Sequence, residues 1–105
     1  MIILKDEQPI GRLYIHRVAK EIRLMDITLL PVYRRQGIGS QIIGDLLRES
    51  EQTNCPVTLH VEMINPDAYR LYERLGFTAV NQRGIHIFME RLPKPVAVPL
   101  NKEVV

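Results

Sequence analysis

Apolar and polar residues change their period along the chain, and these changes divide it into predicted strands and helices. Alternating or continuous apolar runs are typical of strands, whereas apolar spacings of three and four are typical of helices. The patterns predict strands at 1–4, 10–17, 22–30, 57–63, 77–82 and 85–92. They predict one helix over about 37–52 and a second that starts at Asn65–Pro66 and stops at Gly76, because asparagine caps helices, proline suits the first helical position and glycine ends them.

The segments 22–30, 37–52 and 57–63 follow one another as strand, helix and strand. This order predicts a crossover connection that places the two strands parallel and adjacent in one sheet. Nearly every residue of 22–30 is apolar, so we expect this strand to be covered on both faces. The predicted fold class is α/β, with a mixed (α+β) sheet of antiparallel and parallel strands and two helices.

Length and composition predict one small domain over 1–92. The tail 93–105 contains Pro93, Pro95 and Pro99 without any period, and we expect it to be extended, disordered or docked on a partner. A formal net charge of +2 does not indicate a nucleic-acid partner, although it suits a small anionic ligand. The single cysteine, Cys55, permits no internal disulfide, and no apolar stretch reaches the ~20 residues of a membrane span. We therefore expect a cytoplasmic protein with no membrane contact.

The segment 34–40 reads Arg-Arg-Gln-Gly-Ile-Gly-Ser and directly precedes the first apolar turn of a predicted helix. The first turn of a helix has unpaired N–H groups, and glycine lets a ligand approach the backbone closely. Arg34 and Arg35 add positive charge. The segment is therefore a candidate cradle for a pyrophosphate, while a tight turn leading into a buried helix is the alternative interpretation.

Two motifs in this order resemble those of the GNAT superfamily of N-acetyltransferases. Arg34-x-x-Gly37-x-Gly39 follows a strand that ends in Leu-Leu-Pro and is similar to the family's coenzyme A pyrophosphate motif. The later segment 65–77, Asn-Pro-x-Ala-x-x-Leu-Tyr-Glu-x-Leu-Gly-Phe, resembles the family's second motif. The resemblance covers roughly 1–92 and implies a GNAT-like fold with acetyl-CoA, or another acyl-CoA, as co-substrate and an amine as acceptor.

The resemblance also implies which residues bind the coenzyme. In this family the two central parallel strands splay apart, which here would open a gap between 22–30 and 57–63. The pantetheine would pair with the backbone of Ile27, Thr28 and Leu29. The pyrophosphate would lie on the segment formed by Arg34, Arg35, Gln36, Gly37, Ile38, Gly39 and Ser40. Asn65 matches an asparagine that contacts the cofactor or an ordered water, and it is also a plain helix cap.

The resemblance assigns Tyr72 to the tyrosine that lies near the coenzyme sulfur and assists the departing thiolate as a general acid. The alternative role of Tyr72 is that of a core aromatic residue. Asp26 and Glu62 are the carboxylates inside the two central strands, and either is a possible base for the incoming amine. The alternative is that Asp26 and Glu62 are surface or salt-bridged acids and that a chain of waters acts as the base.

No metal site is expected, because His16, His60 and His86 lie on three different predicted strands without metal-ligand spacing, and we interpret them as ordinary strand residues. A typical member of the family begins with a strand and two helices that wall the acceptor site, whereas this chain starts directly with the strands 1–4 and 10–17, which we expect to form a hairpin. The acceptor could be large, a second subunit could supply the wall, or the chain could bind acyl-CoA without transfer. The apolar edge at 1–4 predicts a homodimer.

Overall fold

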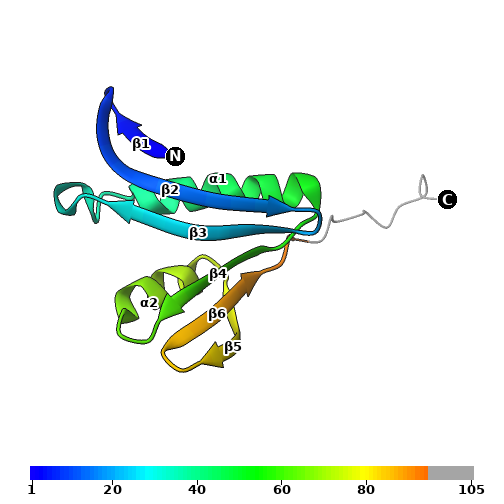
Figure 1. Ribbon diagram of the computed structural model, residues 1–105. Helices are drawn as coiled ribbons and strands as arrows, with labels where there is room; N and C mark the ends of the chain where they lie inside the picture. Colours follow the sequence, from blue (N-terminus) through cyan, green and yellow to red (C-terminus); the bar gives the residue numbers. More distant parts are fainter. Residues whose placement is uncertain (95–105) are drawn as a thin grey trace.

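The computed structural model describes residues 1–94, so that most of the predicted tail, 95–105, lies outside the described residues. Six strands form one mixed sheet in the order β1-β2-β3-β4-β6-β5 (Figure 1). Their bounds are β1 Ile2–Lys5, β2 Gln8–Val18, β3 Glu21–Leu29, β4 Val57–Glu62, β5 Thr78–Arg83 and β6 His86–Arg91. The predicted fold class and all six predicted strands are confirmed, with shifts of a few residues at their ends.

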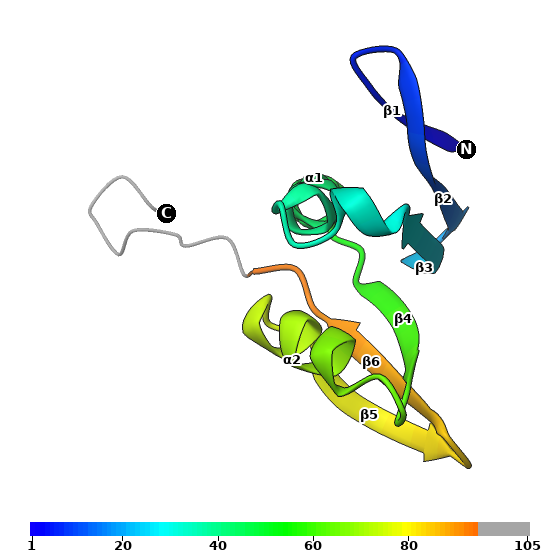
Figure 2. The same cartoon turned by 90° about the vertical axis from the view of Figure 1, so that its left-hand side faces the viewer.

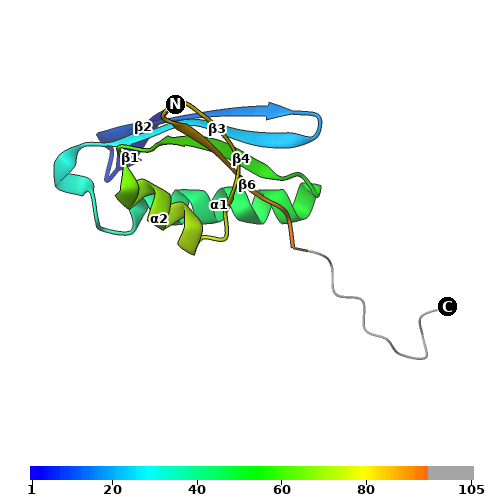
Figure 3. The ribbon, with the colours of Figure 1, turned by 90° about the horizontal axis from the view of Figure 1, so that it is seen from below.

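Two helices, α1 (Ile38–Thr53) and α2 (Pro66–Arg74), lie on the same side of the sheet (Figures 2 and 3). The core fills the space between these helices and the sheet, and its buried members include Ile43 and Leu46 of α1 and the alternating Val57, Leu59 and Val61 of β4. The other face of the sheet, which we call the open face, has no helix over it within residues 1–94. Neither helix is long and apolar enough to cross a bilayer.

The helix ends follow from local chemistry. Asn65 caps α2 by accepting a hydrogen bond from the backbone N–H of Ala68 at 3.2 Å, and Pro66 occupies the first helical position. After α2 the chain reverses at Gly76, whose φ of 95° is costly for any residue with a Cβ. Gly37, immediately before α1, likewise has a positive φ of 81°, a conformation that favours glycine. The predicted start and stop signals are confirmed.

The parallel pairing of β3 with β4 is short. Only Ile22 with Val57 and Arg23 with Thr58 are partners, and beyond them the two strands diverge (Figure 1). Backbone groups on the facing edges of both strands therefore lack a ladder partner over the rest of their length. The predicted adjacency and the predicted gap are both present.

The prediction that β3 is covered on both faces is wrong. Ile22 and Leu24 are buried against the helices, whereas Arg23 and Met25 are exposed on the open face. Tyr14 pairs with Asp26 and its neighbour Ile15 pairs with Leu24, which leaves Met25 as the extra residue of a β-bulge. The bulge shifts the alternation by one residue, and this shift produces an apolar run in a strand with only one covered face.

Candidate active site

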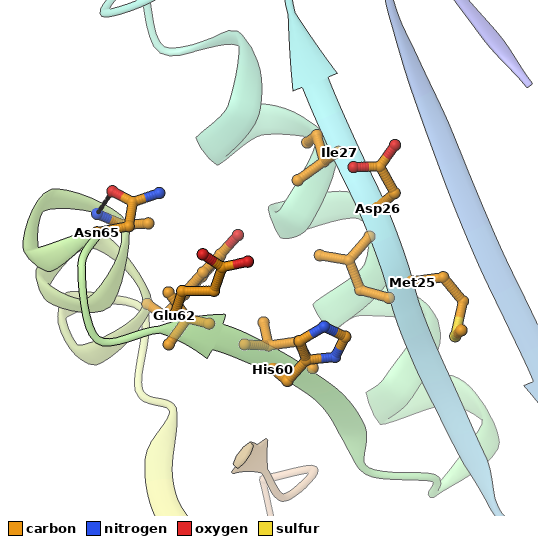
Figure 4. A pocket seen from close by; sticks show the side chains of 11 residues that line it. Met25, Asp26, Ile27, His60, Glu62 and Asn65 are labelled. Carbon is orange, nitrogen blue, oxygen red and sulfur yellow. Dashed lines mark hydrogen bonds between the residues drawn. The ribbon is translucent and has the colours of Figure 1, made fainter. Parts of the chain in front are cut away.

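A cleft of about 320 Å³ occupies the place where β3 and β4 diverge. Three elements form its walls: 24–27 of β3, 59–62 of β4, and Asn65, Ala68 and Tyr72 at and within α2. Figure 4 shows Glu62 and His60 extending from β4 into the space, with Asp26, Met25 and Ile27 on the opposite strand. A strand-like ligand placed here would find unpaired backbone groups on both sides, as in β-strand addition.

The N-terminus of α1 follows the C-terminal end of β3 in the chain and is uncapped. No side chain caps this helix, and its first hydrogen bond runs from the N–H of Gln41 to the carbonyl of Gly37. A Cβ built on Gly37 or on Gly39 would meet no atom within 4 Å. Packing therefore does not require glycine at 39, and no side chain of residues 1–94 caps the N–H groups of the first turn. This arrangement fits a phosphate group, as the sequence predicts.

The segment that leads into α1 is braced by its own side chains. Arg34 Nε donates to the carbonyl of Leu29 at 3.0 Å, and Gln36 Nε2 donates to the carbonyl of Val32 at 2.8 Å. Neither Arg34 nor Arg35 forms a salt bridge with a carboxylate of the described residues. Both guanidinium charges therefore remain available for an anion beside the helix N-terminus.

The three predicted pantetheine-binding residues lie on the diverging part of β3 but differ in their surroundings. Ile27 lines the cleft. Thr28 and Leu29 follow it toward the end of the strand, and Thr28 is engaged through its hydroxyl, which donates to Asp26 at 3.0 Å. Asn65 lines the cleft and caps α2 at the same time, so that both of its predicted roles are compatible.

Tyr72 places its ring between the core and the cleft. The ring meets that of Phe77 edge-on with centroids 5.8 Å apart, and the residue lines the cleft beside Asn65 and Ala68. Burial, and secondarily the negative charge of Asp26, raise the pKa of the Tyr72 hydroxyl above its ordinary value of about 10. Tyr72 therefore remains protonated at neutral pH and can serve as a hydrogen-bond donor.

The two candidate carboxylates differ in their partners. Asp26 forms an ion pair with Arg12, whose Nε lies 2.8 Å from Oδ2, and it also accepts the Thr28 hydroxyl. Glu62 lines the cleft, and its carboxylate has no hydrogen-bond or salt-bridge partner among residues 1–94. Of the two, Glu62 is the carboxylate that is free to meet a ligand.

His60 is a cleft residue that the sequence prediction treated as an ordinary strand residue. It lies on β4 two residues before Glu62, on the same face, and it lines the cleft. Its ring is 5.5 Å from that of His86 and 6.0 Å from that of Phe88, centroid to centroid. The Nδ1 atom of His86 is buried without a hydrogen-bond partner in the described part of the chain. The sequence signal that could have identified His60 is its spacing of two residues from Glu62, which places both side chains on the same face of a predicted strand.

Comparisons with known proteins agree with this geometry. A family model described as the acetyltransferase (GNAT) family matches residues 1–77. The chain belongs to the GNAT family. The predicted resemblance is confirmed, and so is the GNAT-like fold.

Two curated relatives are similar in sequence. The chain is 27% identical over 92 residues to N-alpha-acetyltransferase 50 of Danio rerio, covering 76% of this chain and 55% of the relative. It is 30% identical over 82 residues to the [ribosomal protein bS18]-alanine N-acetyltransferase of Haemophilus influenzae, covering 77% and 56%. The chain thus spans little more than half the length of the curated relatives it matches.

Solved structures show the same fold. The ribosomal-protein-S18-alanine N-acetyltransferase of Escherichia coli superposes with a TM-score of 0.79 at 24% identity, covering 94% of this chain and 71% of that one. The PaiA N-acetyltransferase of Thermoplasma acidophilum, solved in complex with coenzyme A, gives a TM-score of 0.77 at 21% identity, covering 85% and 57%.

Within residues 1–94, no three His, Cys, Asp or Glu side chains are grouped so as to hold a metal ion.

Proposed function

We propose that this GNAT domain is an acetyl-CoA-dependent N-acetyltransferase that transfers an acyl group from the thioester to an amine by direct attack. The observation that carries the proposal is the early end of the β3–β4 pairing, at Arg23 and Thr58, beside an uncapped helix N-terminus. One feature supplies unpaired strand edges for pantetheine and the other supplies N–H groups for pyrophosphate. The relatives named as N-acetyltransferases support the same activity.

The coenzyme would contact three regions of this chain. Ile27, Thr28 and Leu29 would offer backbone groups to pantetheine. The segment Arg34, Arg35, Gln36, Gly37, Ile38, Gly39 and Ser40 would hold the pyrophosphate through backbone N–H groups and arginine charge. Asn65 would approach from the start of α2, where it already lines the cleft.

The transfer needs one proton removed and one supplied. The amine nitrogen forms a bond to the thioester carbonyl carbon as the carbon–sulfur bond breaks, and the sulfur leaves with the bonding electron pair. Glu62 and His60 are positioned to accept the proton that the amine loses, directly or through water. Tyr72, protonated because its pKa is raised, would donate a hydrogen bond to the departing thiolate. Asp26 is held by Arg12 and would act only through its charge.

We propose the amino terminus of a polypeptide as the acceptor. The names of both curated relatives describe acetylation at an α-amino group or at an alanine of a ribosomal protein. His60 and Glu62 line the cleft from the open face of the sheet, and no helix of residues 1–94 covers that face. A chain longer than a small amine can therefore extend out of the cleft.

A non-catalytic acyl-CoA-binding module is the second candidate function. It is favoured by the same uncovered open face, because nothing in residues 1–94 walls an acceptor on that side. The two functions share the coenzyme site and differ only in whether an amine reacts in it.

We also propose that two copies associate through β1 and that the protein is cytoplasmic. Ile2 and Leu4 on this edge strand are 61% and 60% exposed, and exposed apolar edges are usually covered. Most of the tail 93–105, for which docking on a partner is one of the expectations, lies outside the described residues. Sedimentation at micromolar concentration should show a dimer, and a monomer that persists at such concentrations would contradict it.

The experiment that tests the function is incubation with acetyl-CoA and a panel of amines and free-amino-terminus peptides, with the release of free thiol measured over time. Calorimetry with acetyl-CoA runs in parallel. Binding with turnover on at least one acceptor supports the enzyme. Binding with no turnover on any acceptor assigns the binding module, and absence of binding contradicts both.

A further inference from the structure

A second hollow, of about 350 Å³, lies on the open face of the sheet and is separate from the coenzyme cradle. Met25 of β3, Phe88 of β6 and Val80 of β5 give it an apolar wall, and these side chains are 47%, 37% and 57% exposed. Such a concentration of exposed apolar surface in a concave site is characteristic of a binding site.

Polar groups at the far end of this hollow already satisfy one another. Arg23 donates to Glu21 at 2.6 Å, and the hydroxyl of Thr58 donates to the other oxygen of the same carboxylate at 2.8 Å. Because Glu21 and Arg23 already neutralise each other, neither charge requires a charged ligand. The hollow is therefore suited to an apolar group, with the ion pair as a fixed end wall.

The hollow adjoins the cleft. Met25, Leu59 and His60 line both spaces, so that a ligand extending from the cleft past these side chains reaches the hollow. From Glu62 at the cleft to Thr58 at the far end of the hollow, β4 runs four residues, about 13 Å at about 3.3 Å per residue. An extended peptide covers this length with about four residues.

We propose that this hollow binds an apolar side chain of a polypeptide acceptor, two or three residues after the one whose amine reacts in the cleft. The proposal rests on the acetyltransferase function proposed above and names a determinant of acceptor specificity. Its occupant is the acceptor itself because the hollow adjoins the cleft, with Met25 and His60 lining both. A second copy of the chain seated on the open face would cover that junction.

The test uses the full chain and two peptide series, Ala-Gly-X-Gly-Gly amide and Ala-Gly-Gly-X-Gly amide, with leucine, phenylalanine, serine or aspartate at X. We measure kcat/KM at saturating acetyl-CoA, and peptide affinity in the presence of coenzyme A from the NMR signals of the methionine methyl groups. In at least one series, leucine or phenylalanine is expected to exceed serine about tenfold, through KM rather than kcat. A ratio near one in both series overturns the proposal.

Two variants locate the preference. Val80→Ser should reduce the leucine-to-serine ratio toward one. Val18→Ser removes an exposed valine of β2 that lines neither space, and it should keep the wild-type ratio. Equal ratios in the two variants overturn the assignment to this hollow.

The binding arm separates failure of the proposal from failure of the enzyme function. If no peptide is acetylated but leucine peptides still bind about tenfold more tightly than serine peptides, the acetyltransferase function fails and the apolar site stands. If Val80→Ser dissociates a dimer and the wild-type ratio is one, the hollow belongs to an interface between copies, and the proposal is overturned.

Discussion

The ring of Tyr72 meets the ring of Phe77 edge-on, with the two centroids 5.8 Å apart. Packing against the core therefore holds Tyr72 in place at the border of the cleft. Tyr72→Phe keeps this packing and removes only the hydroxyl. We expect kcat to fall by about 100-fold at saturating acetyl-CoA, because the hydrogen bond to the departing thiolate is lost. The free energy of unfolding should change by less than about 1.5 kcal/mol, as measured by urea denaturation.

Tyr69→Phe is the matched control. Tyr69 lies on the same helix and packs against the core, but it does not line the cleft. It should keep the wild-type kcat. Equal turnover in wild type and Tyr72→Phe would exclude the hydroxyl of Tyr72 from the mechanism.

The start of α1 permits a test that separates folding from coenzyme binding. Gly39→Asp has room for its side chain and places a carboxylate in the first helical turn, where negative charge stabilises a helix by about 0.3–1 kcal/mol. The same charge should repel a pyrophosphate, and we expect the Kd for acetyl-CoA to rise at least about tenfold in calorimetry. Stability and affinity should therefore change in opposite senses.

Gly44→Asp adds the same charge five residues farther along the helix, where a Cβ would meet only the side chain of Arg48 at 3.9 Å. Its effect on acetyl-CoA binding should be less than about threefold, since it lies outside the first turn. If both variants weaken binding equally, the N-terminus of α1 is not the pyrophosphate site.

The two acidic residues near the cleft should differ in their effect on turnover. Glu62→Gln removes a carboxylate that has no partner within residues 1–94, and kcat is expected to fall by about 100-fold if it accepts the proton of the amine. Asp26→Asn alters a carboxylate already held by Arg12, and kcat should change by less than about threefold. His60→Asn tests the second proton acceptor in the same assay. Normal kcat in both Glu62→Gln and His60→Asn would leave water as the base.

The sequence was sufficient where local chemistry decides the structure. The cap at Asn65 and the reversal at Gly76 depend on neighbours within a few residues, and both were predicted. The open face of β3 was missed because the bulge at Met25 depends on the register with β2, where the flanking pairs Leu24 with Ile15 and Asp26 with Tyr14 are 9 and 12 residues apart in the chain. His60 was missed for a similar reason, since its position in the cleft follows only from the divergence of β3 and β4.

Acid should weaken the fold partly through Glu49. Arg17 of β2 donates to both carboxylate oxygens of Glu49 in α1, at 2.6 and 2.9 Å, and this hydrogen bonding lowers the pKa of Glu49. A lowered pKa means that the unfolded chain takes up the proton first, so the stabilisation is full above the ordinary value of about 4.3 and is lost as pH falls through the lowered one. Glu49→Gln should cost about 0.5–1 kcal/mol at pH 7 and little near pH 2, by urea denaturation.

Asp45→Asn provides the control for this pH dependence. Asp45 pairs with Arg48 one turn away on the same helix, and both side chains are more than 60% exposed. The loss should stay below about 0.5 kcal/mol at both pH values. A stability difference between Glu49→Gln and wild type that is the same at pH 7 and pH 2 would contradict the assignment to this ion pair.

Gly11 of β2 lies against the backbone of β3 more closely than any other residue type allows. A Cβ at this position would be 2.1 Å from the carbonyl oxygen of Thr28 and 3.0 Å from the Cα of Leu29, and both of these are backbone atoms. Gly11→Ala must therefore push the two strands apart, and we expect it to lower the free energy of unfolding by about 2–3 kcal/mol in urea denaturation.

Gly44→Ala separates this steric effect from the general effect of replacing glycine. Its Cβ has ordinary contacts within α1, so the exchange should stabilise the protein by up to about 1 kcal/mol through helix propensity. The two substitutions add the same methyl group and should shift the denaturation midpoint in opposite directions. Because Gly11 packs on the end of β3 that continues from the cleft, Gly11→Ala should also weaken acetyl-CoA binding by more than Gly44→Ala does. A midpoint for Gly11→Ala at or above that of wild type would show that β2 and β3 are not in this close contact.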